Sequence, residues 1–184
     1  MMPRALFVLL VWLIPAGGGH AQPQSLADFL IQGMPAQHRQ EARTLAICAL
    51  AEAGSARLDH AGILHVLRRR SRQLSARSGR VVTAAGMARR YCRIFRDPPA
   101  HRAFLLAMRW GEIPHNKQYA YAWQQAQLSV VLFLLNVDVD PCDGRSMHWG
   151  SHADAKKPPR GSVRVACGPT RNIFWTGPLK GTHI

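Results

Sequence analysis

Apolar side chains recur every three to four positions along most of the chain, which is the spacing that places them on one face of an α-helix. Residues 44–53 form an almost unbroken apolar run, and Gly54 follows where a helix C-cap is expected. Residues 119–136 are apolar nearly all round at their C-terminal end, which predicts the most buried helix of a bundle. Further helices are predicted over residues 26–31, over 59–70 with Asp59 as N-cap, over 83–95 with Thr83 as N-cap, and from Pro98-Pro99 onward with Phe104, Leu105 and Met108 inside.

Helical spacing stops at Asp140-Pro141. Beyond it, short runs at 163–165 and 173–175 predict a small β-hairpin. The predicted fold class is therefore mainly α, with an irregular C-terminal segment. The predicted organisation is a signal peptide over 1–21, a polar lead-in over 22–40 and a single domain over 41–184, helical over 41–136 and loop-rich over 137–184.

The first 21 residues predict export. Arg4 precedes a short apolar stretch from Ala5 to Ile14, and small residues lead to Ala21, where cleavage is expected. The stretch is shorter than the roughly 20 apolar residues of a membrane-spanning helix. We therefore expect a periplasmic or secreted protein with no integral membrane segment after cleavage; an uncleaved N-terminal anchor is the alternative.

Four cysteines in an exported chain predict disulfide bonds. The preferred pairs are Cys142 with Cys167, which flank the loop-rich C-terminal part, and Cys48 with Cys92, which would join two helices. The sequence leaves the two other connectivities open. The cysteine spacings do not resemble those of a zinc ribbon.

The chain is strongly basic, with 24 Lys plus Arg against 10 Asp plus Glu and a net charge of +14. Outside the cytoplasm this charge favours anionic envelope polymers as partners, such as teichoic acids, lipopolysaccharide or the carboxylates of peptidoglycan. Nucleic acid is not expected, because aromatic and basic residues are not interleaved as on a single-strand binding surface. The basic cluster of Arg68, Arg69, Arg70 and Arg72 favours a solvated helix face over a dedicated anion site.

Glu52 is the candidate catalytic residue. On a helix it shares a face with Leu45, Cys48 and Ala49, so its carboxyl group is expected to meet the core or the floor of a cleft. Apolar surroundings and a helix C-terminus both raise the pKa of a carboxyl group, which favours a proton donor near neutral pH. The alternative is a half-solvated glutamate paired with an arginine.

The C-terminal segment holds aromatic and hydrogen-bonding side chains on loops, a combination that suits a sugar-binding cleft. The candidate substrate-binding residues there are His148, Trp149, Asn172 and Trp175. The two tryptophans serve equally well as packing residues, and Asn172 as a turn residue.

His148, His152 and Asp154 are metal-ligating residue types close together. Their spacing approaches that of zinc D-alanyl-D-alanine peptidases but is one residue too short, and no later His-x-His follows. No metal and no other cofactor is therefore predicted, and a zinc peptidase is the least favoured function.

Two segments carry a resemblance to a known family. Ala42-Arg43-Thr44 through Ala51-Glu52-Ala53, with the helix that follows, resembles the opening of the spore-cortex-lytic type of cell wall hydrolases, which are lysozyme-like lytic transglycosylases. Thr170-Arg171-Asn172-Ile173-Phe174-Trp175 is similar to the closing segment of that family. The chain departs from the family where Ala51 replaces a glycine, Gly54 and Ser55 replace Arg-Gly, Ala56 replaces a second glutamate, and Ile173 replaces a histidine.

The resemblance implies a lysozyme-like monomer that cleaves peptidoglycan glycan strands, without a cofactor. Glu52 would protonate the glycosidic oxygen and then act as base, giving a 1,6-anhydro product. Ser55, Tyr119 and Tyr121 join the candidate substrate-binding residues, whereas Trp123 is expected in the core. The alternative from another class is a non-catalytic, basic envelope-binding protein on the same fold.

Overall fold

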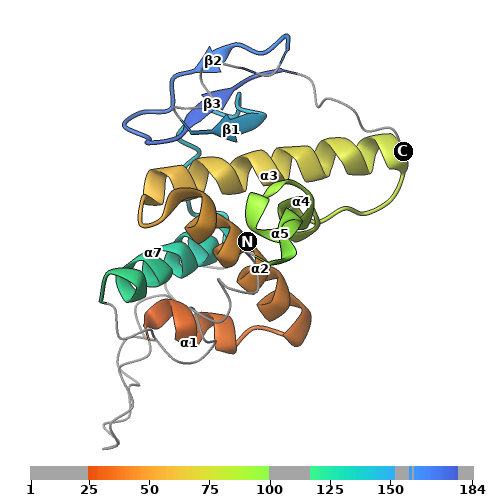
Figure 1. Cartoon of the computed structure of the whole chain (residues 1–184). Helices are drawn as coiled ribbons and strands as arrows, with labels where there is room; N and C mark the ends of the chain where they lie inside the picture. Colours follow the sequence, from red (N-terminus) through yellow and green to blue (C-terminus); the bar gives the residue numbers. More distant parts are fainter. Residues whose placement is uncertain (1–24, 100–116, 152–157, 159, 178–184) are drawn as a thin grey trace, which may run out of the picture.

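The computed structural model describes residues 25–99, 117–151, 158 and 160–177, and Figure 1 shows their arrangement. The chain forms helices first and then a small antiparallel sheet near its C-terminal end, so the predicted, mainly α fold class is confirmed. The elements are α1 (Leu26–Gln32), α2 (Ala36–Ala53), α3 (Arg57–Ser78), α4 (Ala84–Tyr91), α5 (Arg93–Arg96), α7 (Lys117–Leu134), β1 (His148–Gly150), β2 (Arg164–Val165) and β3 (Ile173–Trp175).

Helix α2 forms the centre of the helical body. Every residue from 44 to 50 is buried, because small side chains such as Ala46 and Ala49 let neighbouring helices pack closely on all sides. Helices α1, α3, α4, α5 and α7 all contact it. The helix predicted over 119–136 is α7, in which every residue from 122 to 134 is buried or half-buried, whereas Leu135, 45 % exposed, lies beyond its end.

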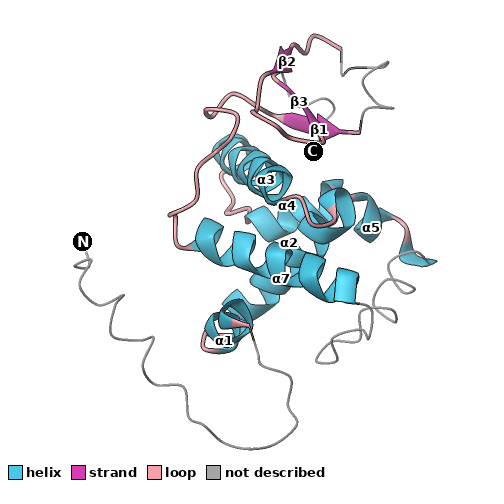
Figure 2. Cartoon of the chain, turned by 90° about the vertical axis from the view of Figure 1, so that its left-hand side faces the viewer, coloured by secondary structure: helices cyan, strands magenta, loops and turns pink. Residues whose placement is uncertain are grey.

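Helix α3 separates the sheet from the other helices, as Figures 1 and 2 show from two sides. It is longer than predicted, running through Ser78 to an αL C-cap at Gly79. The predicted N-cap is also wrong, because Ala56 holds that position. Asp59 instead lies in the first turn, 1 % exposed, where its two carboxylate oxygens accept the backbone N–H groups of Arg171 and Asn172 at 2.9 and 2.5 Å.

The predicted helix over 83–95 begins as expected, since the Thr83 hydroxyl accepts the Gly86 N–H at 3.0 Å. It is interrupted at Cys92, whose backbone is extended, and resumes as the short helix α5. Cys92 is bonded to Cys48 of α2, and Cys142 is bonded to Cys167, so both preferred disulfides are confirmed. The helix predicted after Pro98-Pro99, with Phe104, Leu105 and Met108, lies outside the described residues, as does the signal peptide.

The predicted hairpin is confirmed by the antiparallel pairing of β2 with β3. Strand β1 adds a third strand that the sequence pattern did not predict, on the other edge of β3, with His148 opposite Trp175 and Trp149 opposite Phe174. This pairing brings Trp149 to the helical body. Within the described ranges, no helix has the length and apolar composition needed to span a membrane.

Arg72 is exposed, but the other three arginines of the basic cluster on α3 do not form the solvated face that the sequence favoured. Arg68 donates to Phe133 O of α7, and Arg69 pairs with Asp140 and donates to Ser146 O at 2.6 Å. Arg70 donates to Met147 O at 2.7 Å and is 5 % exposed. Arg69 and Arg70 therefore attach the C-terminal segment to α3, and Arg68 attaches α7 to it.

Gly62 of α3 allows the sheet to approach the helix. A Cβ atom at this position would lie 2.5 Å from Cζ of the buried Phe174 ring of β3. We expect Gly62→Ala to lower the free energy of unfolding by about 1–3 kcal/mol, because the ring must move within a packed core. Chemical denaturation would measure the change. Gly86→Ala on α4 is the control, because its Cβ would meet nothing closer than 3.5 Å; an equal loss in both variants would contradict the steric explanation.

Candidate functional site

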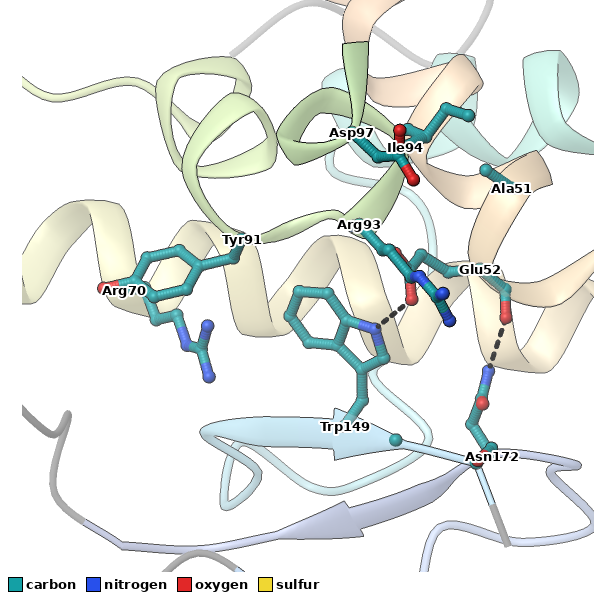
Figure 3. A pocket seen from close by; sticks show the side chains of 11 residues that line it. Ala51, Glu52, Arg70, Tyr91, Arg93, Ile94, Asp97, Trp149 and Asn172 are labelled. Carbon is teal, nitrogen blue, oxygen red and sulfur yellow. Dashed lines mark hydrogen bonds between the residues drawn. The ribbon is translucent and has the colours of Figure 1, made fainter. Parts of the chain in front are cut away.

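A cleft of about 580 Å³ opens where the end of α2 meets α3, the α4–α5 break and strand β1. Figure 3 shows the side chains that surround it. Its lining combines acidic, basic and aromatic groups: Ala51, Glu52, Arg70, Tyr91, Arg93, Ile94, Asp97, Trp149, Gly150, Ser151 and Asn172.

Glu52 lies in this cleft with both carboxylate oxygens hydrogen-bonded. Oε1 accepts the backbone N–H of Arg93 at 2.8 Å, and Oε2 accepts the indole N–H of Trp149 at 3.2 Å. Among the described residues Glu52 forms no ion pair with an arginine, so the arginine-paired alternative is not what the structure contains. The carboxylate is half-buried and held in a fixed orientation between α5 and β1.

The turn after α2 positions Glu52. Gly54 ends the helix with φ 58°, a backbone conformation that glycine adopts without strain. Its carbonyl accepts a 2.8 Å hydrogen bond from Nε2 of His60, a fully buried side chain of α3. The Asn172 side-chain amide donates to the carbonyl of Glu52 itself at 3.3 Å. Helix α3, through His60, and the segment just before β3, through Asn172, therefore both hold this turn.

The break at Cys92 supplies the N–H that binds Glu52. Arg93 is the first residue of α5, where a backbone N–H has no partner within the helix. A continuous helix over 83–95, as the sequence predicted, would have used that N–H in its own hydrogen-bond ladder. The interruption therefore creates the contact.

The structure brings three of the predicted site residues together, namely Glu52, Trp149 and Asn172. His148 points elsewhere, since its Nδ1 lies 2.8 Å from Nη2 of Arg70 and it does not line the cleft.

The other predicted contacts lie away from the cleft. Trp175 is 4 % exposed in β3 and packs as a core residue, because its neighbours on both sides are strands. Tyr121 is 56 % exposed on α7, and Ser55 lies half-buried in the α2–α3 turn; neither lines the cleft. The side chain of Tyr119 lies outside the described residues, as do His152 and Asp154 of the considered zinc trio.

Sequence reasoning missed the arginines and Tyr91 as cleft residues. The sequence favours a solvated face for Arg70, and no motif singles out Tyr91. Arg70 in fact stacks on the Tyr91 ring, 4.2 Å from guanidinium carbon to ring centroid, and lies 5.2 Å from the Trp149 ring. Helical spacing places Arg70 on a face of α3 but contains no signal for the β strand that covers that face.

Burial shifts the pKa of two groups around the site. Desolvation lowers the pKa of Arg70 to about 10, opposed by Tyr91. Desolvation also lowers the pKa of His60, opposed by hydrogen bonds to backbone carbonyls. His60 is therefore neutral in the folded protein near neutral pH, with its proton on the Nε2 atom that donates to Gly54.

The neutral state of His60 predicts a pH dependence of stability. Below its ordinary pKa of 6.5, His60 takes up a proton in the unfolded chain but not in the folded one, so the free energy of unfolding falls with falling pH. The pKa of His65, also lowered by burial, adds a loss of the same sign. Urea denaturation between about pH 7.5 and pH 5 would measure this slope. His60→Gln should reduce the slope; an unchanged slope would contradict the assignment.

Comparison of the chain with protein-family models, with curated proteins and with solved structures gave no significant match.

Proposed function

We propose that this protein is an exported enzyme that cleaves the glycan strands of peptidoglycan, of the lytic transglycosylase or muramidase type, with Glu52 as its single general acid and base. The observation that supports this most is the carboxylate of Glu52 in an open cleft, oriented by two N–H groups and bordered by an indole ring. The resemblance of residues 42–53 and 170–175 to the spore-cortex-lytic type of cell wall hydrolases supports the same function. The two disulfides support export, because such bonds persist in oxidising compartments.

The proposed reaction uses the free lone pairs of Glu52. Each carboxylate oxygen already accepts one N–H, so the acid proton resides on a remaining lone pair that faces the cleft. Glu52 donates this proton to the glycosidic oxygen while the bond from that oxygen to C1 of the muramoyl sugar breaks. The resulting carboxylate then takes the proton of the 6-hydroxyl of the same sugar, whose oxygen bonds to C1. The products are a free hydroxyl end and a 1,6-anhydro end, and no water is consumed.

The side chains around Glu52 suit a saccharide. Trp149 exposes an aromatic face to the cleft, on which the apolar face of a pyranose ring can pack, while Asn172 supplies an amide for hydroxyl groups. A second carboxylate is not needed for the intramolecular reaction. Asp97 also lines the cleft and is the residue that a hydrolytic, two-carboxylate mechanism would use.

The test is digestion of purified peptidoglycan sacculi by the purified exported protein, with and without a metal chelator. We expect soluble muropeptides with 1,6-anhydro ends, identified by mass spectrometry and unaffected by the chelator. Reducing ends would instead indicate a muramidase. Protein that sediments with sacculi but releases nothing would contradict the enzyme and support the non-catalytic envelope-binding protein. Chelator-sensitive release of D-alanine would indicate the zinc peptidase.

A further inference from the structure

Arg70 is a buried cation without an anionic partner. It is 5 % exposed, and a buried charge is costly unless it is paired. Its contacts are all with neutral groups: Nε donates to Met147 O, Nη2 donates to Nδ1 of His148, and the guanidinium lies against the Tyr91 and Trp149 rings. In the described part of the chain no carboxylate forms an ion pair with it.

The unpaired guanidinium of Arg70 forms part of the wall of the cleft. Arg70 lines the cleft on the far side of the Trp149 ring from Glu52, as Figure 3 shows. Two of its three guanidinium nitrogens are used in the contacts above, and Nη1 has no hydrogen-bond partner among the described residues. A planar guanidinium with a free N–H edge is the group that binds carboxylates best in proteins.

Arg93 adds a second positive charge to the same cleft. Its backbone N–H holds Glu52, while its exposed guanidinium lines the cleft and forms no ion pair or hydrogen bond with a described residue. Glu52, the acid that Arg93 holds through its backbone, forms no ion pair with Arg70 or Arg93 within the described ranges.

We propose that Arg70 and Arg93, on opposite sides of the Trp149 ring in Figure 3, form a carboxylate-binding subsite of the cleft, so that the cleft selects glycan strands carrying free carboxylates. This inference rests on the proposed function and names the substrate class of the same site. In peptidoglycan the carboxylate comes from one of two sources: the lactyl ether of a muramoyl sugar without a peptide, or the stem peptide attached to it. A sugar that packs on Trp149 would lie between the two arginines, because Figure 3 shows Arg70 and Arg93 on opposite sides of the Trp149 ring.

The test measures binding, so it does not depend on turnover. The protein with Glu52→Gln is titrated with three soluble glycan strands: peptide-free strands, strands with unmodified stem peptides, and strands whose carboxylates have been converted to methylamides. We expect the methylamide strands to bind at least roughly tenfold more weakly than one of the carboxylate forms, since a charged hydrogen bond contributes about 1.5–3 kcal/mol. The carboxylate form that binds more tightly identifies the source. Equal binding of all three strands would overturn the proposal.

Two substitutions separate this subsite from the general positive charge of the protein. Arg93→Gln removes the guanidinium but keeps the backbone N–H that binds Glu52, whereas Arg96→Gln removes an exposed charge of the same helix that does not line the cleft. We expect a loss of roughly tenfold for Arg93→Gln on carboxylate strands and no loss on methylamide strands. Equal effects of the two substitutions would overturn the proposal. Arg93→Gln is preferred to a change at Arg70, because Arg70 also attaches β1 to α3.

These outcomes are independent of the proposed activity. If the sacculus digestion yields no products but the carboxylate strands bind selectively, the subsite stands and the catalytic proposal fails. If digestion proceeds and the methylamide strands bind equally well, the catalytic proposal stands and the subsite fails.

Discussion

Glu52→Gln is expected to reduce glycan cleavage by about 10²–10⁴-fold, the usual contribution of a general acid or base. Glutamine has nearly the same shape, but it cannot donate an acid proton to the glycosidic oxygen or take one from the attacking hydroxyl. It also leaves one of the two N–H donors, from Arg93 or Trp149, without an acceptor. The measurement is the initial rate at which soluble muropeptides are released from sacculi.

Glu41→Gln is the matched control for this variant. Glu41 lies on the same helix as Glu52 and is half-buried, but it does not line the cleft. We expect it to retain the rate of the unmodified protein, and circular dichroism would establish that both variants are folded. Equal rates for the two folded variants would rule out Glu52 as the acid.

Removal of the Cys48–Cys92 bond is expected to lower both stability and activity. The bond closes a loop with a sequence separation of 44 residues, so the double variant Cys48→Ala, Cys92→Ala should lose roughly 4 kcal/mol of the free energy of unfolding. Cys48 lies one helical turn before Glu52, and Cys92 directly precedes Arg93. The covalent bond therefore holds together the two segments that form the Glu52–Arg93 hydrogen bond, and a more mobile carboxylate should cleave more slowly.

The comparison variant is Cys142→Ala with Cys167→Ala. This variant opens a loop with a sequence separation of 25 residues, and its bond does not join the segments that carry Glu52 and Arg93. Denaturation and cleavage rates would be measured for both double variants at a temperature where each is fully folded. A folded Cys48→Ala, Cys92→Ala protein with an unchanged rate would show that the bond stabilises the fold without positioning the carboxylate.

Features that depend on neighbours in the chain could be predicted from the sequence. Helical spacing located α1 and α7 to within a few residues, and the hydroxyl of Thr83 marked the start of α4. The aromatic and β-branched runs marked the β2–β3 pairing, and the positions of the cysteines favoured both disulfides without excluding other pairs. Glu52 was identified because a carboxylate at the end of an apolar helical run is unusual in any fold.

The composition of the cleft depended on contacts between distant segments. The sequence makes Trp149 and Trp175 equally suitable as cleft or packing residues, yet the addition of β1 to the edge of β3 brings Trp149 to Glu52 and buries Trp175. Asp59 does not cap α3; its carboxylate instead accepts two backbone N–H groups of the segment before β3, more than a hundred residues away in the chain.

The sequence by itself determined the helical class of the domain and its one candidate acid, because periodicity and caps act through local backbone geometry; it favoured the two disulfide pairs but left the other connectivities open. Only the tertiary structure decided that α2 is the central helix, that the arginines of α3 hold the C-terminal segment, and that Arg70 and Arg93 meet Glu52 in one cleft. The physical reason is that a periodic pattern specifies which face of an element is buried, whereas packing across the whole chain decides which other element covers it.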